Sequence, residues 1–382
     1  MAVRIPVAPV MLRWALERSG RDRQDLAKAF PKLDSWLNGD LAPTLNQLEQ
    51  FAQRTYTPLG FLFLDDPPLE TLPLPDYRTM GGAGVGRPSP DLLDTIDTCE
   101  QRQDWFKSYA LETGIEALDF VGSVTLAIEP VIAGADMRRA LDFGVVQRRE
   151  YGTWTDALFG LIEAAEHLGI LVMVNGVVGN NTSRKLDPGE FRGFALADQY
   201  APLIFINGAD TKAAQIFTLA HELAHVWLGQ SAVSKPDLSK EAENATERWC
   251  NIAAAEVLVP LDTFRPELRG PELVDDLERL AREYRVSTLV ILRRLFDSRR
   301  LSWEQFNAEY DGELGRVIAL AAQSGGGGQF YYTQPYRVSR RFASALIAQA
   351  HEGQTLYRDA LRLLSLRKIE TFERLGRYLG AA

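Results

Sequence analysis

In this chain of 382 residues, the fold and the kind of site are best predicted from one segment, Phe217-Thr-Leu-Ala-His-Glu-Leu-Ala-His-Val-Trp-Leu-Gly229. On a helix, His221 and His225 are four positions apart, so both rings project from one face and can share one cation. Zinc accepts imidazole nitrogen at about 2.0–2.1 Å, which two such rings can supply together. We expect the opposite side of the helix to face a core and to leave the metal face free, because it carries apolar residues at helical spacing. These residues are Ile216, Leu219, Leu223 and Val226.

Glu222 adjoins the first histidine, where its carboxylate can reach a water on the metal rather than the metal itself. The alternative is a pair of histidines that only pack or face solvent. With only four histidines in the chain, fewer than about 0.006 chance matches to this pattern are expected, which weighs against that alternative. The pattern therefore predicts a metallopeptidase with one zinc per chain and Glu222 as the catalytic base.

A catalytic zinc needs a third protein ligand, and the best one is Glu247. On a predicted helix from about residue 239 to 257, Glu247 and Asn251 face the same way, so Asn251 can orient a ligand histidine by a hydrogen bond. Cys250 lies beside them and can in principle bind zinc, although a lone cysteine in an apolar stretch is more often a core residue. Three further glutamates compete for the role of Glu247. They are Glu241, Glu243 and Glu256.

Composition sets the broad class of protein. Apolar residues make up 46% of the chain, the formal charge is −9, and there are two cysteines. A sizeable core is therefore expected, without a disulfide framework and without an overall charge that suits nucleic acid. The N-terminus lacks the apolar core of a signal peptide, and no run of about 18 apolar residues occurs. We expect a cytoplasmic protein that does not enter a membrane.

The apolar pattern along the chain predicts an α+β fold, mostly helical, with a small β-sheet in the peptidase core and helical domains on both sides. Apolar runs at 170–174, 191–197 and 202–207 predict three strands, and a helix is expected from about Thr211 to Leu228. Five regions are predicted: a head of short helices (1–66), a proline- and glycine-rich connector (67–90), a helical segment (91–150), the zinc peptidase domain (151–310) and a helical C-terminal domain (311–382).

The motif around His221 and His225, followed by Glu247-Arg-Trp-Cys-Asn251-Ile-Ala-Ala-Ala-Glu-Val-Leu-Val-Pro260, resembles the ImmA/IrrE family of metallopeptidases. The resemblance implies a gluzincin-like core in which two histidines and one glutamate bind zinc and the glutamate of the motif is the base. Known members cleave a helix-turn-helix repressor in stress response or mobile-element control. The implied partner is therefore a regulatory protein, either such a repressor or a toxin/antitoxin-type neighbour.

The segments 43–49, 67–78 and 330–334 resemble long members of the family that carry an Xre-like helix-turn-helix head. In this chain the turn and the recognition helix are shortened, since Asp25–Phe30 is followed at once by Pro31–Gly39. Residues 33–37 carry Asp34 but no lysine or arginine, and residues 1–66 hold eight basic and eight acidic residues. DNA reading needs cationic donors, so we expect this degenerate head to contact protein rather than DNA.

Tyr331 and Tyr332 follow four glycines, and a hydroxyl from either could stabilise an oxyanion near the zinc. The alternative for both is ring stacking in a domain contact. The rival function is a non-proteolytic regulator or antitoxin-like binding protein that uses the zinc fold as a scaffold. The presence of Glu222 favours the enzyme, because a scaffold needs no base. A DNA-binding repressor is disfavoured by the head.

Overall fold

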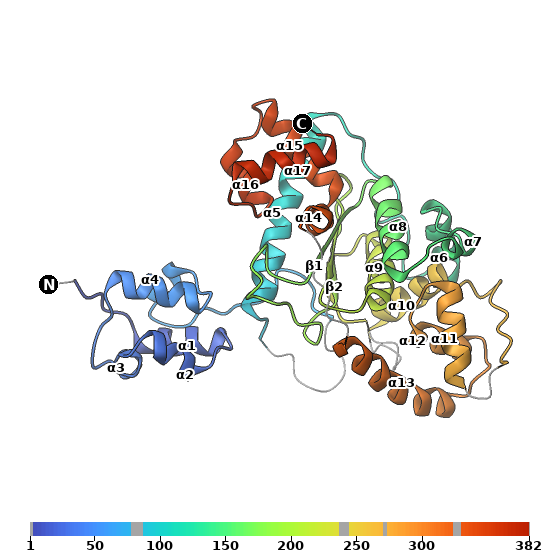
Figure 1. Cartoon of the computed structure of the whole chain (residues 1–382), viewed down its shortest axis with the longest axis horizontal. Coiled ribbons are helices and arrows are strands. Elements are labelled where there is room, and N and C mark those ends of the chain that lie inside the picture. The colour runs from blue at the N-terminus through green and yellow to red at the C-terminus, as the bar shows by residue number, and fades with distance from the viewer. Residues whose placement is uncertain (1–2, 78–86, 237–243, 270–272, 324–329, 382) are drawn as a thin grey trace. The chain divides into compact units, whose positions relative to one another are not determined.

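The computed structural model describes residues 3–77, 87–236, 244–269, 273–323 and 330–381. The chain divides into two compact units (Figure 1). The first comprises residues 1–73 and 85–96, and the second comprises residues 74–84 and 97–382. None of the helices in the described part of the chain is both long enough and apolar enough to span a membrane.

The first unit is a small helical bundle with its own apolar core. Trp36 and Phe51 lie at its centre, with exposed fractions of 2% and 0%. The helix that begins after Thr44 is capped there, because the Thr44 hydroxyl and the Gln47 side chain form a reciprocal capping box. The helical elements of this unit are α1 (Pro9–Arg18), α2 (Arg23–Ala29), α3 (Leu33–Asn38), α4 (Leu45–Arg54) and the 3-10 helix η1 (Leu59–Phe63).

The second unit is built on a mixed four-stranded sheet with the strand order β1-β3-β2-β4. The three predicted strands are confirmed as β1 (Leu171–Asn175), β2 (Gly193–Leu196) and β3 (Leu203–Asn207). β3 is buried along its whole length, which explains its unbroken apolar run. It pairs parallel to β1 and antiparallel to β2. The fourth strand, β4 (Ala232–Ser234), was not predicted and pairs antiparallel to β2.

Helices cover both faces of this sheet (Figure 1). α8 (Trp154–His167) and α9 (Lys212–Leu228) pack together on one face, whereas α14 (Phe330–Val338) packs against β1. α5 (Pro90–Glu112) is joined to the sheet through Gln103, whose amide donates to the carbonyl of Leu196 at 2.9 Å. The remaining helices are α6 (Pro130–Ala140), α7 (Val145–Arg149), α10 (Ala245–Leu258), α11 (Leu273–Tyr284), α12 (Thr288–Asp297), α13 (Trp303–Gln323), α15 (Arg340–His351), α16 (Tyr357–Leu363) and α17 (Ile369–Leu379).

The helices of the structure differ from the predicted regions in two places. The segment 91–150 is not helical throughout, because residues 113–129 form turns and loop between α5 and α6. Gly114 and Gly122 have positive φ there, which a continuous helix does not allow. The predicted boundary at 310/311 lies inside α13, whose Phe306 and Tyr310 belong to the same core as the sheet. Burial of these rings keeps the start of α13 with the peptidase core.

Candidate metal centre

α9 carries the histidine pair and has well-defined ends. Its N-cap is Thr211, whose hydroxyl accepts from the backbone N–H of Ala214, and its C-cap is Gly229 at φ 66°. Gly229 also lies against Gly122, where an added Cβ would come within 2.9 Å of the Gly122 Cα. Both the left-handed backbone and this close approach require glycine, so the residue that ends α9 also fixes the preceding loop against it.

Three side chains converge between α9 and α10. The Nε2 atoms of His221 and His225 are 3.2 Å apart. Glu247 completes the cluster, with Oε1 at 3.0 Å from His225 Nε2 and Oε2 at 3.3 Å from His221 Nε2. Among the described residues, these three form a group whose ligand atoms all lie within 4.8 Å of one another. Ligand atoms at about 2.0–2.1 Å from a tetrahedral ion are about 3.3 Å apart, so this cluster fits a zinc ion.

The hydrogen bonding of His221 supports a cation at this point. Its Nδ1 lies 3.0 Å from Asn251 Oδ1, so Nδ1 carries the proton and Nε2 presents a lone pair to the cluster. That lone pair faces the second imidazole and a carboxylate within hydrogen-bond distance. Two neutral imidazole nitrogens and a carboxylate turned toward one another repel unless a cation or protons lie between them. Asn251 thus makes the contact that the sequence predicted for it.

The ionisation states also suit metal ligands. Burial alone would raise the pKa of the Glu247 carboxyl, but its contacts with His221 and His225 outweigh burial and lower it to about 2. Burial lowers the pKa of His225. At neutral pH the glutamate is therefore ionised and the imidazole neutral, which are the forms that bind a metal.

Glu222 lies beside the cluster with its carboxylate in an apolar, enclosed position. The residue is 0% exposed, and neither carboxylate oxygen makes a hydrogen bond of good geometry among the described residues, although the nearby Ser234 hydroxyl acts to lower its pKa. Burial, followed by the charge of Glu247, raises the pKa of Glu222 well above its usual value. A buried carboxylate without partners is costly, so we interpret this group as one that needs a polar ligand in the site.

β2 and β4 close the site on the side of Glu222. An added Cβ on Gly193 of β2 would come within 3.1 Å of Glu222 Oε1 and within 2.9 Å of the Phe205 carbonyl oxygen. Ser234 of β4 places its hydroxyl 3.3 Å from His225 Nε2. Tyr77 stacks on the His225 ring, with ring centroids 6.1 Å apart and planes at 24°.

The expectation that the metal face of α9 is free is wrong. Every residue of α9 from 215 to 228 is buried, because α10, α8 and the sheet pack around the helix. His221 and His225 are both 0% exposed, and Glu247 is 5% exposed. The apolar stripe predicted the core-facing side correctly, but the opposite side faces other parts of the same unit.

The structure separates Glu247 from its described competitors. Glu256 bonds instead to Arg294, with an Oε2–Nη2 distance of 2.7 Å. Cys250 is a buried core residue outside the ligand cluster of the described chain, and burial raises its pKa well above the usual value. Glu241 and Glu243 lie outside the described residues. Tyr331 and Tyr332 lie in α14, and their side chains are outside the described part of the structure.

Three residues at the site were missed by sequence reasoning: Gly193, Ser234 and Tyr77. No local pattern marks them, because β4 is only three residues long and Tyr77 lies in the proline-rich connector. The connector segment was noted for its proline and glycine content and for its resemblance to long family members, not as part of the site. Contacts between distant parts of the chain bring all three residues to the histidines.

A buried cluster of two histidines and a glutamate in an α+β core is the arrangement of a metallopeptidase centre. Residues 165–296 match the peptidase-family model described as the IrrE N-terminal-like domain, and this region, about a third of the chain, contains the whole cluster and Glu222. Residues 338–378 match a model described as a domain of unknown function (DUF8813). No curated protein matches the chain. The central part of the chain is thus similar to a peptidase-family domain.

Proposed function

We propose that the protein is a zinc-dependent endopeptidase with one zinc per chain, held by His221, His225 and Glu247. The observation that carries the proposal is the convergence of two imidazole nitrogens and a carboxylate within 3.0–3.3 Å of one another. A bound zinc supplies a Lewis acid that polarises the scissile carbonyl and makes water acidic. The match of residues 165–296 to a peptidase family supports the same class.

In this proposal Glu222 moves the proton. As the water oxygen bonds to the carbonyl carbon, a Glu222 oxygen accepts a proton from that water. The same carboxyl then donates the proton to the leaving amide nitrogen as the C–N bond breaks. No hydrogen bond of good geometry among the described residues occupies either oxygen, which leaves the carboxylate available for this role. Asn251 does not touch the reacting atoms, but it holds His221 in the tautomer that presents Nε2.

The substrate that we propose is a regulatory protein, either a helix-turn-helix repressor or a toxin/antitoxin-type neighbour, in stress or mobile-element control. This choice rests on the family resemblance and on the helical head, whose α2 and α3 are arranged as short consecutive helices. The rival is a non-proteolytic regulator in which the same fold binds a partner without cutting it. The cluster is buried, and for this reason the experiment must also test the non-proteolytic function.

Glu222→Gln tests the mechanism because it keeps the shape of the side chain but removes the base. We expect normal zinc content, intact capture of the substrate and a loss of cleavage of at least about 10²-fold, the low end of general-base contributions. Proteins encoded beside this chain serve as candidate substrates in a pull-down that is scored for both binding and cleavage. Glu163→Gln, at an exposed position of α8, is the matched control and leaves all three properties unchanged.

Cleavage by Glu222→Gln at the wild-type rate contradicts the mechanism. If both forms bind a neighbour and neither cuts it, the scaffold function replaces the enzyme. Glu247→Ala distinguishes the role of zinc ligand from that of catalytic base, because this variant is expected to lose most of its zinc in metal analysis. Full zinc occupancy in Glu247→Ala would transfer the third-ligand role to another residue.

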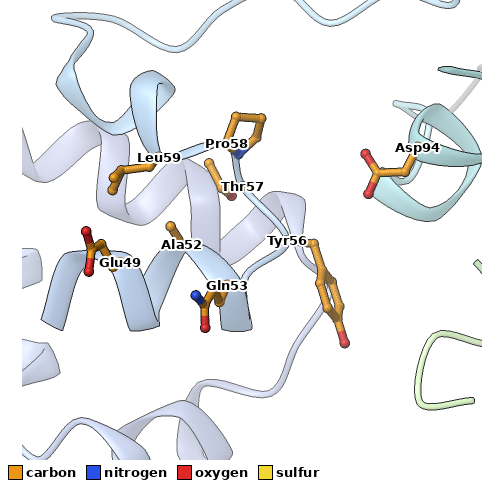
Figure 2. A pocket seen from close by; sticks show the side chains of 8 residues that line it. All are labelled: Glu49, Ala52, Gln53, Tyr56, Thr57, Pro58, Leu59 and Asp94. Carbon is orange, nitrogen blue, oxygen red and sulfur yellow. The ribbon is translucent and has the colours of Figure 1, made fainter. Parts of the chain in front are cut away.

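For the head we propose contacts with protein rather than with DNA. Asp34 on α3 pairs with Arg23 at 2.6 Å, so one of the few cations near the recognition position is already bound to a carboxylate. A pocket of about 440 Å³ on this unit holds the carboxylates of Glu49 on α4 and Asp94 on α5 (Figure 2). None of the eight residues that line it is a lysine or an arginine. Such a surface repels phosphate and suits a polar or cationic protein segment.

A further inference from the structure

The connector contributes an extra extended segment to the edge of the sheet. Asp76 forms a parallel bridge with Val233, the central residue of β4. The backbone N–H of Tyr77 donates to the Val233 carbonyl at 3.0 Å, and the Val233 N–H donates to the Pro75 carbonyl at 3.0 Å. β4 is the last strand of the described sheet, so these bonds use the N–H and C=O that Val233 turns away from β2.

The same edge leads directly to the metal cluster. Ser234 follows Val233 and approaches His225 Nε2 at 3.3 Å, while Tyr77 stacks on the ring of His225. A chain that pairs with β4 is therefore held with one of its side chains against a ligand histidine. The residues of the connector that make these contacts thus hold an extended backbone at β4 and an aromatic ring on His225.

We propose that β4 is the docking edge for an extended substrate polypeptide, and that residues 75–77 occupy it as an internal competitor that restrains the peptidase. This inference rests on the proposed function and adds both the conformation of the substrate and a means of regulation. Substrate and connector exclude each other, because both would need the single N–H and the single C=O that Val233 turns away from β2. Strand addition to an exposed sheet edge is a general mode of peptide binding.

The pairing is short enough to be displaced. Pro73 and Pro75 have no N–H, so the connector cannot extend its ladder toward the N-terminus beyond the two bonds to Val233. Competition is nevertheless effective, because a tethered segment has an effective concentration of order 1 mM. With an intrinsic Kd of about 0.1 mM for the connector segment itself, a free peptide binds the restrained chain about 10-fold more weakly than the released chain.

The first test measures peptide binding in the zinc-loaded, full-length Glu222→Gln protein, so that no cleavage intervenes. The probe is a synthetic, fluorescently labelled peptide with the sequence of residues 68–77. Tyr77→Pro removes both the N–H donor and the stacked ring. We expect it to bind the probe at least about 10-fold more tightly than the parent does. Thr71→Pro, at an exposed connector position outside the paired residues 75–77, is the matched control and leaves the affinity unchanged.

Equal probe affinity for Tyr77→Pro and its parent overturns the proposal and leaves the segment as simple protection of a sheet edge. In the active background, Tyr77→Pro is expected to cut the natural substrate faster than wild type. A fall in cleavage with normal zinc content would instead make Tyr77 part of the substrate or reaction machinery, and would also overturn the restraint. Tighter probe binding without cleavage by any form supports the docking edge and contradicts the proposed peptidase function alone.

The second test locks the segment in place. A disulfide between Asp76→Cys and Val233→Cys joins the two residues of the bridge. Neighbouring strands lie about 4.7–4.9 Å apart, which is within the Cα separation that a cystine spans. In the oxidised protein the probe is expected to lose binding by at least about 10-fold, and reduction is expected to restore it. Probe binding that is the same in the oxidised and reduced forms would show that the β4 edge is not the docking site.

Discussion

The hydrogen bond between Asn251 and His221 yields a quantitative prediction about metal affinity. In Asn251→Ala the His221 Nδ1–H loses its acceptor at 3.0 Å, inside a site where the imidazole is 0% exposed. A buried donor without a partner costs about 1–3 kcal/mol. The metal-free protein avoids much of this cost, because its imidazole can change tautomer and donate from Nε2 toward Glu247 Oε2, 3.3 Å away.

The zinc-bound form has no such escape, since Nε2 must keep its lone pair for the metal. The lost hydrogen bond therefore makes the free energy of zinc binding less favourable. A change of about 1–3 kcal/mol corresponds to a zinc Kd about 5-fold to 150-fold higher. Competition with a chromophoric chelator measures this Kd on the purified full-length chain. Asn251→Asp keeps an acceptor and is expected to retain the wild-type affinity.

Asn207→Ala is the control for the general loss of a buried amide. Asn207 is 0% exposed and bonds to the Phe191 carbonyl and the Ala209 N–H, outside the metal cluster. We expect this change to lower the unfolding temperature but not the zinc affinity. A Kd for Asn251→Ala within about twofold of wild type, in a protein with a normal circular dichroism spectrum, would refute the orienting role of Asn251.

Three further predictions concern the surroundings of the site and the head. Gly193→Ala places a Cβ within 3.1 Å of Glu222 Oε1, and it should lower the free energy of unfolding by about 1–3 kcal/mol in a urea titration. Arg294→Met breaks the buried pair with Glu256 and should lower it by about 3–5 kcal/mol, whereas zinc content should stay at one per chain because Glu256 is not a ligand. The full chain should bind duplex DNA no more tightly than micromolar at physiological salt, and a sequence-specific nanomolar complex would contradict the protein-binding head.

Local patterns were sufficient to predict the elements that carry the metal ligands. The spacing of His221 and His225 is a property of a single helix, and the same is true of Glu247 and Asn251. Thr211 and Gly229 mark the ends of α9, and the structure places both as its caps. These features need no partner from elsewhere in the chain, because helix period and capping are set within a few residues.

The sequence ranked Glu247 first among the glutamates but left its competitors open. Glu247 and Glu256 lie on the same helix, α10, and both are acidic residues near the motif. The choice depends on what each side chain meets: the two imidazoles in one case and Arg294 in the other. That difference arises because α10 packs against α9 at one point and meets Arg294 of α12 at another, which no spacing within α10 reveals.

By itself, the sequence determined the α+β class, three of the four strands in the described part of the chain, the helix of the histidine pair, and the residue types of the candidate metal site. Tertiary structure decided the rest: that the metal face is buried, that Gly193 and Ser234 border it, and that Tyr77 lies on His225. The physical reason is the range of the interactions. Helical periodicity acts over a few residues, whereas a three-residue edge strand and its partner segment are defined only by hydrogen bonds between Val233 and residues far away in the chain.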